Sequence, residues 1–251
     1  MGSKSHWVET LNEFKGEKFV ELFCGSAVLS ANLASEAILN DVDPVVYKIL
    51  KNFEHLIVPK VFTKADYFLK RSSPEWWKYV YCFQKMSFSG VFRYSKNGYN
   101  VPVKKEIESI SVRKEYLLAK RKYKKLKPLI LNQSYLDVPL EMMTDKVVVL
   151  DPPYEGSKAA YNVKFDYEAY WKRVEEIKQV AKVVLIFDSV KNLKKQNIPV
   201  YKTRKLRVNG ARPGDEEGMA IFVLGKYLNP EDSIKASRDQ IKGISEDSVN
   251  P

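Results

Sequence analysis

Four consecutive residues, Asp151-Pro152-Pro153-Tyr154, combine chemical groups that could hold a planar amine. The carboxylate and the Pro152 carbonyl are hydrogen-bond acceptors, and the tyrosine ring offers a π-face. Because two adjacent prolines lack N–H donors and fix φ, the segment neither extends a sheet nor begins a helix freely. We interpret the tetrapeptide as a candidate site for an exocyclic NH₂ group. The alternative is an ordinary proline-rich turn with a capping aspartate.

The residues before this tetrapeptide predict where it lies. Val147-Val148-Val149-Leu150 is a continuous run of β-branched and aliphatic side chains, typical of a strand buried on both faces. Ligands in open α/β sheets bind at the carboxyl ends of such strands. The tetrapeptide is therefore expected at the ligand-binding edge of a sheet.

A second candidate site follows the first predicted strand, Lys18–Phe23. Cys24-Gly25-Ser26-Ala27 is a turn of small residues before a helix predicted over residues 28–34. Gly25 permits a ligand to approach the backbone closely. Asp41, at the end of the next predicted strand, is placed to accept hydrogen bonds from ribose hydroxyls. A generic strand–helix turn with a capping aspartate is the alternative.

Residues 53–127 differ in character, because aromatic and basic side chains are interleaved there. Lys96-Asn97-Gly98, between aromatic flanks, predicts a β-hairpin with the Asn-Gly pair at its tip. The basic run of residues 113–127 predicts phosphate contacts and includes Arg121, Lys122 and Lys124. The alternatives are that the aromatic residues form a small core of this segment and that the basic run is a solvated helix face.

The remaining segments continue an alternation of strands and helices. Helices are predicted over residues 8–14 and 165–180, and strands over residues 129–135 and 182–187. The last two strands, residues 200–208 and 219–224, are separated by a polar, glycine-rich loop. They are expected to form an antiparallel hairpin at a sheet edge.

The composition favours a polyanionic partner. The 251-residue chain has 42 Lys+Arg against 31 Asp+Glu, giving a net charge of +11. Nucleic acid is the first expectation and an anionic membrane surface is the competitor. No apolar run reaches the length of a membrane span and no signal peptide is evident, so we expect a cytoplasmic protein without a membrane partner. Two cysteines and two histidines predict reduced thiols and no metal site.

Taken in order, these motifs resemble those of the Dam-type (D12 class) N6-adenine DNA methyltransferases, which use S-adenosylmethionine. Residues 23–27 resemble the family's F-x-G-x-G loop, residues 151–154 its D-P-P-Y, and residues 2–4 its amino-terminal G-G-K. The segment F-S-G-V-F-R-Y-S-K-N-G-Y-N-V-P, residues 88–102, is similar to its recognition hairpin, F/Y-N-G-L-x-R-x-N-x-x-G-x-F-N-V-P. The resemblance covers residues 2–226 in the α-class motif order.

The resemblance implies a Rossmann-like α/β methyltransferase fold. Its sheet would be seven-stranded and mostly parallel with a terminal antiparallel hairpin, and a small helical and hairpin DNA-recognition domain would be inserted. Residues 1–52 and 128–228 would form the S-adenosylmethionine-binding catalytic domain, 53–127 the recognition domain, and 229–251 a polar tail.

The resemblance also implies roles for individual residues. Those assigned to the cofactor are Lys4, Phe23, Gly25, Asp41, Ser134, Tyr135 and Asp151. Ala27 departs from the family pattern, because it replaces the second glycine of the loop and its methyl group could crowd the cofactor.

In the recognition hairpin, Arg93 corresponds to a guanine-reading arginine, since bidentate Arg to guanine is the commonest specific base contact. Val91 and Pro102 would contact a thymine, and Phe88 and Ser89 would enter the stack behind the extruded base. The residues expected to contact DNA are thus Phe88, Ser89, Val91, Arg93, Asn100, Pro102, Arg121, Lys122 and Lys124. Ser89, Val91 and Ser95 depart from the family pattern, which leaves the exact site open.

The expected reaction is transfer of a methyl group from S-adenosylmethionine to the N6 amine of a flipped-out adenine in double-stranded DNA, at GATC or a related short site. Asp151 and the Pro152 carbonyl would accept the two N6 hydrogens while Tyr154 stacks on the ring. The alternatives are methylation of cytosine N4 or of adenine in RNA, and a catalytically inactive DNA-binding relative. We expect a bacterial or phage-encoded monomer, with a dimer on DNA as the alternative.

Overall fold

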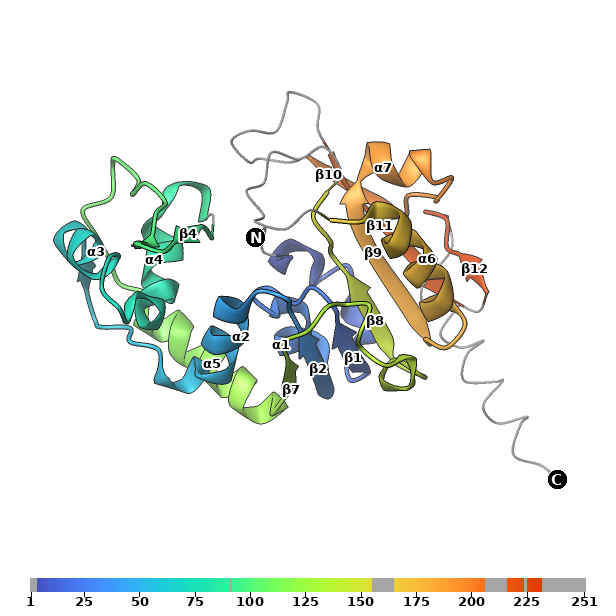
Figure 1. Ribbon diagram of the computed structural model, residues 1–251, viewed down its shortest axis with the longest axis horizontal. Helices are drawn as coiled ribbons and strands as arrows, with labels where there is room; N and C mark the ends of the chain where they lie inside the picture. The colour runs from blue at the N-terminus through green and yellow to red at the C-terminus, as the bar shows by residue number, and fades with distance from the viewer. Residues whose placement is uncertain (1–3, 91, 155–164, 206–215, 224, 232–251) are drawn as a thin grey trace.

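A mostly parallel β-sheet with helices on both faces forms the centre of the molecule (Figure 1). The computed structural model describes residues 4–90, 92–154, 165–205, 216–223 and 225–231. Among these residues, seven strands lie in the order β10-β11-β9-β8-β1-β2-β7, and a short further strand, β12, pairs with β11. The predicted sheet, with an antiparallel hairpin at one edge, is confirmed.

The parallel part of the sheet consists of β7 (Leu129–Leu131), β2 (Glu36–Asn40), β1 (Lys18–Glu21), β8 (Val147–Leu150) and β9 (Val183–Ser189). The antiparallel part consists of β11 (Glu216–Val223), β10 (Lys202–Lys205) and β12 (Lys226–Tyr227). From β1 the chain passes to β2 on one side and later returns to β8 on the other. This reversal of strand order is the place where ligands bind in open α/β sheets.

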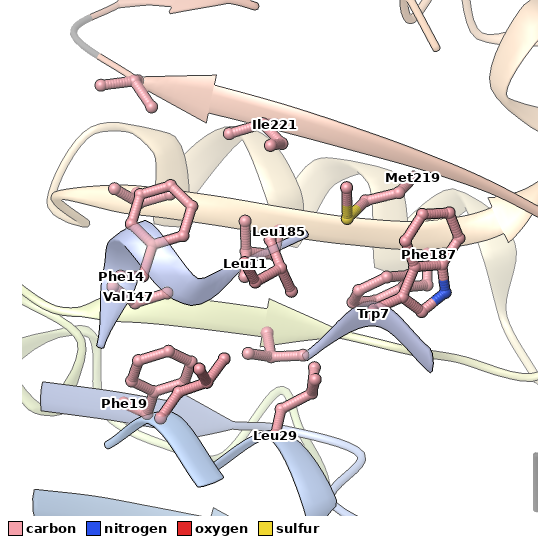
Figure 2. Packing of buried hydrophobic residues seen from close by; sticks show 14 of the residues in the cluster. Trp7, Leu11, Phe14, Phe19, Leu29, Val147, Leu185, Phe187, Met219 and Ile221 are labelled. Atoms are coloured by element: carbon pink, nitrogen blue, oxygen red, sulfur yellow. The ribbon is translucent and has the colours of Figure 1, made fainter. Parts of the chain in front are cut away.

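Alternate side chains of the central strands face two hydrophobic cores, as the two-residue period of a strand requires. The first core contains strand residues such as Phe19, Val147 and Leu185, and it is covered by the N-terminal segment and α1 (Val28–Leu33) (Figure 2). The second core contains Val148 and Ile186 and is covered by α6 (Tyr167–Lys178) and α7 (Val190–Lys195). The strand that precedes Asp151 is thus buried from both sides.

The N-terminal segment is not the single helix predicted over residues 8–14. It contains two short 3₁₀ helices, Ser5–Trp7 and Asn12–Phe14, joined by turns. Trp7, Leu11 and Phe14 are buried against the sheet (Figure 2). Their spacing is that of an amphipathic helix, but 3₁₀ turns also place side chains three residues apart on one face. The prediction of one short helix is therefore wrong about the backbone.

Residues 53–127 contain a small core of their own, separate from the two cores of the sheet. Its elements are α3 (Lys64–Lys70), α4 (Val80–Met86), the paired β3 (Phe62–Thr63) and β6 (Ser109–Ile110), the hairpin of β4 (Tyr94–Ser95) and β5 (Gly98–Tyr99), and short 3₁₀ helices. Tyr67, Phe83 and Tyr99 are among its most deeply buried side chains. For these aromatic residues the packing interpretation is therefore the correct one.

The hairpin differs from the prediction at its tip. Tyr94 pairs with Tyr99 and Ser95 with Gly98, so the two loop residues are Lys96 and Asn97 rather than the Asn-Gly pair. Gly98 begins the returning strand with φ of +102°, and a Cβ there would lie 2.1 Å from the Arg71 carbonyl oxygen. Glycine is required at this position by the close backbone contact as well as by the positive φ.

Helix α5 (Arg113–Leu126) connects the inserted segment to the sheet. Tyr116, in its first half, lies in the core of the inserted segment. Tyr123 and Leu126, in its last turns, pack with α2 (Pro44–Lys51) and β2, and the Tyr123 hydroxyl donates to the Leu50 carbonyl. The helix therefore joins the core of the inserted segment to a further buried cluster with α2 and β2, and it holds the inserted segment against the edge of the sheet near β2 and β7 (Figure 1).

Candidate active site

Asp151 to Tyr154 follow the carboxyl end of β8, beside the point where strand order reverses. Asp151 is partly buried and Pro152 is buried. The Pro153 carbonyl accepts a hydrogen bond from the Tyr167 hydroxyl at the start of α6 (3.1 Å). Helix α6 thus anchors this loop at the end of the strand, where the sequence predicted a ligand site.

Lys4 lies in the same place, although it precedes Asp151 by almost 150 residues. Its ammonium is 2.9 Å from Asp151 Oδ1, 2.7 Å from Glu217 Oε1 and 3.1 Å from the Tyr154 hydroxyl. Only 8% of the residue is exposed. Lys4 is therefore a buried cation between two carboxylates and not a solvated charge near the start of the chain.

Glu217, on β11, receives four hydrogen-bonding groups. Lys4 Nζ (2.7 Å) and the Tyr154 hydroxyl (2.6 Å) donate to Oε1. Trp7 Nε1 donates to Oε2 (2.8 Å), and His6 Nε2 lies 3.0 Å from the same oxygen. A buried carboxylate with this many partners is stabilised in its ionised form.

The two carboxylates respond differently to burial. For Glu217, burial raises the pKa, but the nearby Lys4 charge and the donated hydrogen bonds lower it to about 2. For Asp151, burial raises the pKa by more than Lys4 lowers it. For Lys4, burial lowers the pKa, but the combined charges of Asp151 and Glu217 leave it raised. The site therefore contains a firmly charged lysine, a firmly charged glutamate and a more basic aspartate.

The turn after β1 and the end of β2 form the second candidate site. Gly25 (φ +47°) donates its backbone N–H to Asp41 Oδ2 (3.0 Å), and Asp43 N–H donates to Oδ1 (3.0 Å). Burial raises the pKa of Asp41 to about 6, against the effect of these two hydrogen bonds. Ala27 is also left-handed, with φ of +50°. Alanine therefore has here the backbone conformation that the family's glycine would adopt without strain.

Three aromatic rings lie close together near this turn. The Phe23 ring lies 5.1 Å from that of Tyr135 and 5.9 Å from that of Phe165, measured between centroids. Ser134 is engaged locally, since its hydroxyl accepts the Leu136 N–H (3.3 Å). The structure thus brings Phe23 and Tyr135 together, and it places Ser134 in the turn that follows β7.

In the hairpin, Arg93 is exposed and turned onto Asn100. Its Nε donates to Asn100 Oδ1 and its Nη2 to the Asn100 carbonyl, both at 2.9 Å. Phe88 is 46% exposed, and Pro102, also exposed, accepts the Phe88 N–H through its carbonyl. The predictions for Val91, Gly2 and Ser3 lie outside the described residues, and Ser89 is described only as part of a 3₁₀ helix, Phe88–Gly90.

The basic residues of α5 lie apart from the hairpin. Arg121, Lys122 and Lys124 are exposed, and Lys122 donates to Asn32 Oδ1 of α1 (2.7 Å). In Figure 1, α5 runs along the lower edge of the inserted segment, whereas β4 lies at its upper part. The two groups of residues predicted to contact DNA therefore lie in different parts of the inserted segment.

Several residues of the site were missed from the sequence. Glu217, His6 and Trp7 complete the charged cluster, and Glu21 at the end of β1 accepts the Ser30 N–H (2.8 Å), with its pKa raised to about 7 by burial. Glu217 gave a weak signal, because it stands two residues before the apolar run 219–224, in a segment that the sequence predicted as a polar loop. His6 and Trp7 gave no such signal, because nothing in the local sequence relates them to β11.

Among the described residues, no set of histidine, cysteine and acidic side chains is arranged to hold a metal ion. Nor does the described part of the chain contain a helix that is both long and apolar enough to cross a bilayer. Cys24 and Cys82 are both free and buried.

The chain was compared with known families and structures. A family model described as D12 class N6 adenine-specific DNA methyltransferase matches residues 1–209. No curated protein sequence matches the chain significantly. A solved structure, a conserved hypothetical protein of Streptococcus pyogenes, is similar with a TM-score of 0.42 and 12% identity, covering 90% of this chain and 95% of that one.

Two further solved structures are similar at the same level. One is the rRNA methyltransferase AviRa of Streptomyces viridochromogenes, with a TM-score of 0.40, 11% identity, and 86% of this chain and 82% of that chain covered. The other is a dimethyladenosine transferase of Plasmodium falciparum, with a TM-score of 0.41, 10% identity, and 87% and 60% covered. The family match includes Lys4, the Gly25 turn, the inserted segment and Asp151.

Proposed function

Because the chain belongs to the D12 class of N6-adenine-specific DNA methyltransferases, we propose that it methylates the N6 amine of an adenine flipped out of double-stranded DNA. The observation that carries this proposal is the junction of Lys4, Asp151 and Tyr154 at the carboxyl end of β8. An exocyclic amine needs two acceptors and a flat surface, and this loop has the residues for both. The recognised sequence would be GATC or a related short site.

The turn after β1 fits S-adenosylmethionine, the methyl donor that the family implies. Gly25 has no side chain in a left-handed turn beside the strand end. Asp41 already accepts two backbone N–H groups, but an ionised carboxylate has about four lone-pair sites, which leaves acceptor capacity for ribose hydroxyls. Phe23 and Tyr135 offer ring faces to an adenine. When bound, S-adenosylmethionine supplies a methyl group on a positively charged sulfur.

The residues of the tetrapeptide would prepare the amine for transfer. N6 is a poor nucleophile because its lone pair is delocalised into the ring. Hydrogen bonds from N6 to Asp151 and to the Pro152 carbonyl would draw the nitrogen towards tetrahedral geometry, with Tyr154 against the ring. The nitrogen lone pair would then form the bond to the methyl carbon as the bond from that carbon to sulfur breaks, and the electron pair of the broken bond would stay on sulfur. Positioning of the reactants carries most of the rate.

Charge is the second contribution of the protein. As the bond forms, positive charge develops on N6, and a preorganised carboxylate stabilises it. The nitrogen must then lose one proton. Asp151 is the first acceptor, because burial raises the pKa of this carboxyl above its ordinary value.

We further propose that residues 53–127 form the DNA-recognition unit and that Arg93 reads a guanine. The two bonds to Asn100 occupy two of the five N–H groups of the guanidinium, and they fix its plane. The remaining N–H groups suit a bidentate contact with guanine O6 and N7. The proposed setting is DNA in a bacterial cytoplasm.

The test is product identification. The protein is incubated with S-adenosylmethionine carrying a labelled methyl group and one nucleic acid, which is duplex DNA in one reaction and RNA in another. The nucleic acid of each reaction is then digested to nucleosides. We expect label in N6-methyldeoxyadenosine from DNA alone. Label in N4-methyldeoxycytidine, label in RNA, or no transfer by a folded, cofactor-binding protein would each contradict the proposal.

A further inference from the structure

Glu217 lies outside the tetrapeptide, but it contacts two of the groups that surround Asp151. Lys4 Nζ is 2.7 Å from Glu217 and 2.9 Å from Asp151. The Tyr154 hydroxyl is 2.6 Å from Glu217 Oε1 and 3.4 Å from Asp151 Oδ1. Glu217 is therefore the common partner of the cation and the ring that flank the proposed acceptor.

The position of Glu217 is set by the sheet and not by a loop. Its Cα pairs with Ser189 of β9 on one side and with Arg204 of β10 on the other. Only 4% of the residue is exposed. Trp7 Nε1 and His6 Nε2, at 2.8 Å and 3.0 Å, engage the second carboxylate oxygen and so restrict its rotation. A carboxylate restrained in this way fixes the positions of the Lys4 ammonium and the Tyr154 hydroxyl that donate to it.

We propose that Glu217 is a positioning residue for methyl transfer, which holds the Lys4 ammonium and the Tyr154 hydroxyl and shares the lysine charge with Asp151. This inference rests on the proposed function, because it concerns how Asp151 and Tyr154 receive the adenine. If Lys4 had Asp151 as its one carboxylate partner, the pair would be neutral and Asp151 would be a weaker acceptor. With Glu217 on the same ammonium, one lysine is opposed by two carboxylates.

The surrounding charges agree with a net negative cluster. Burial lowers the pKa of His6, so the imidazole is mainly neutral at pH 7 and does not cancel the excess negative charge. Burial and then the Glu217 charge raise the pKa of Asp151, while Lys4 lowers it. The titratable groups that act on Asp151 include Lys4, Glu21, Tyr154, Tyr170 and Glu217, and the buried Asp188 of β9 acts on both of these tyrosines.

A purely structural role for Glu217, as an anchor for the N-terminal segment, predicts lower stability but no change in the chemistry of Asp151. Glu217→Gln alone does not separate these roles, because its amide NH₂ would face the Trp7 N–H or the Lys4 ammonium, both of which are donors. The Trp7→Phe variant removes the indole N–H, which can only donate and so could not pair with the NH₂ group of a glutamine at position 217. The informative comparison is therefore Trp7→Phe against Trp7→Phe/Glu217→Gln.

Steady-state transfer of labelled methyl to duplex DNA is measured for both proteins from pH 5 to pH 9, at temperatures where both are folded. We expect the double variant to lose about 10²-fold in kcat with a much smaller change in the KM for DNA, as for misplaced reacting groups. The fall of kcat/KM at low pH, the acid limb of the pH profile, should move to lower pH in the double variant, because removing the Glu217 charge lowers the pKa of Asp151. Trp7→Phe/Glu217→Asp should restore the limb and part of kcat.

Equal kcat values and superimposable acid limbs in Trp7→Phe and Trp7→Phe/Glu217→Gln would overturn the positioning role. A wild-type protein that transfers no methyl group to DNA would instead refute the proposed function, and the catalytic part of this inference with it. Methyl transfer by the wild type therefore shows which of the two has failed: the positioning role if the wild type is active, and the proposed function if it is not.

Discussion

At the scale of single residues, the environment of each carboxylate decides what it can do. Glu217 and Asp151 share one lysine, yet the pKa of Glu217 is lowered to about 2 and that of Asp151 is raised. The difference arises because Glu217 accepts hydrogen bonds from several donors, whereas for Asp151 burial outweighs the attraction of Lys4. The result is one carboxylate suited to holding its neighbours and another suited to accepting hydrogens.

Asp41 gives a prediction about pH. Its carboxylate form is the one that accepts from ribose hydroxyls, and burial raises its pKa to about 6. Protonation therefore competes with cofactor binding below pH 6. We expect the Kd for S-adenosylmethionine, measured by calorimetry, to be constant above pH 7 and to rise by up to about tenfold per pH unit below pH 6.

The control is Asp41→Asn, which should bind S-adenosylmethionine weakly and with a Kd that no longer changes between pH 7 and pH 5. A wild-type Kd that is the same at pH 5 and pH 7.5 would remove Asp41 from the cofactor site.

At the scale of elements, the turn between β1 and α1 contains a strained alanine. Ala27 has φ of +50° and is 1% exposed, and a left-handed alanine costs roughly 1–2 kcal/mol. Ala37, on β2, is 7% exposed, belongs to the same core and has no positive φ. Ala37→Gly should lower the free energy of unfolding by about 1–2 kcal/mol, through lost burial and added chain entropy. Ala27→Gly should change it by less than about 1 kcal/mol, since relief of strain offsets the same losses.

Urea unfolding of the two variants measures this difference directly. Equal losses of stability in both would show that Ala27 is not strained in the folded protein.

The proposed role of Arg93 in base reading predicts a change in specificity. Arg93→Ala should relax the preference for one guanine by about 1–3 kcal/mol, measured as the ratio of kcat/KM on the preferred site and on sites with that base changed. Lys96→Ala, at the hairpin tip, is the matched control, because it removes an exposed positive charge between Ser95 and Asn97 without touching Asn100. It should weaken binding without altering the ratio. An unchanged ratio in Arg93→Ala would exclude it from base reading.

Sequence patterns predicted most elements because their signals are local. The run Val147–Leu150 identified a buried central strand, and the segments 200–208 and 219–224, separated by a polar loop, identified the edge hairpin. Patterns failed where different backbones give the same spacing, as in the 3₁₀ helices around Trp7 and Phe14. They also misplaced the hairpin tip, because the contact of Gly98 with the Arg71 carbonyl comes from the fold and not from the turn.

At the scale of the whole molecule, the site is assembled from distant parts of the chain. Lys4 and Glu217 are 213 residues apart, and Tyr94 of the hairpin donates to Asp43 Oδ1 (2.7 Å) at the start of α2, two residues after Asp41. The family resemblance suggested Lys4, but it gave no partner for it on β11. Such pairs depend on strand order, which no local sequence pattern contains.

Net charge predicts a steep salt dependence. With a net charge of +11, DNA binding should weaken linearly in log Kd against log salt, with a slope of about 0.9 per phosphate neutralised. Arg121→Gln/Lys124→Gln on α5 should reduce this slope by up to about 2 if both residues contact phosphates. Lys15→Gln/Lys226→Gln removes the same charge from exposed positions, one shortly before β1 and one in β12, and should leave the slope nearly unchanged. Equal slopes in the two double variants would place α5 outside the DNA-binding surface.

The central claim is that Asp151 prepares the adenine amine for methyl transfer, and one measurement tests it most directly. Single-turnover transfer of labelled methyl from S-adenosylmethionine to duplex DNA is compared for the wild type and Asp151→Ala, with folding and cofactor binding checked by thermal unfolding and calorimetry. We predict a variant that is folded and binds cofactor and DNA, but transfers at least about 10²-fold more slowly, as when a preorganised electrostatic contact is lost. Transfer by Asp151→Ala at the wild-type rate would contradict the account.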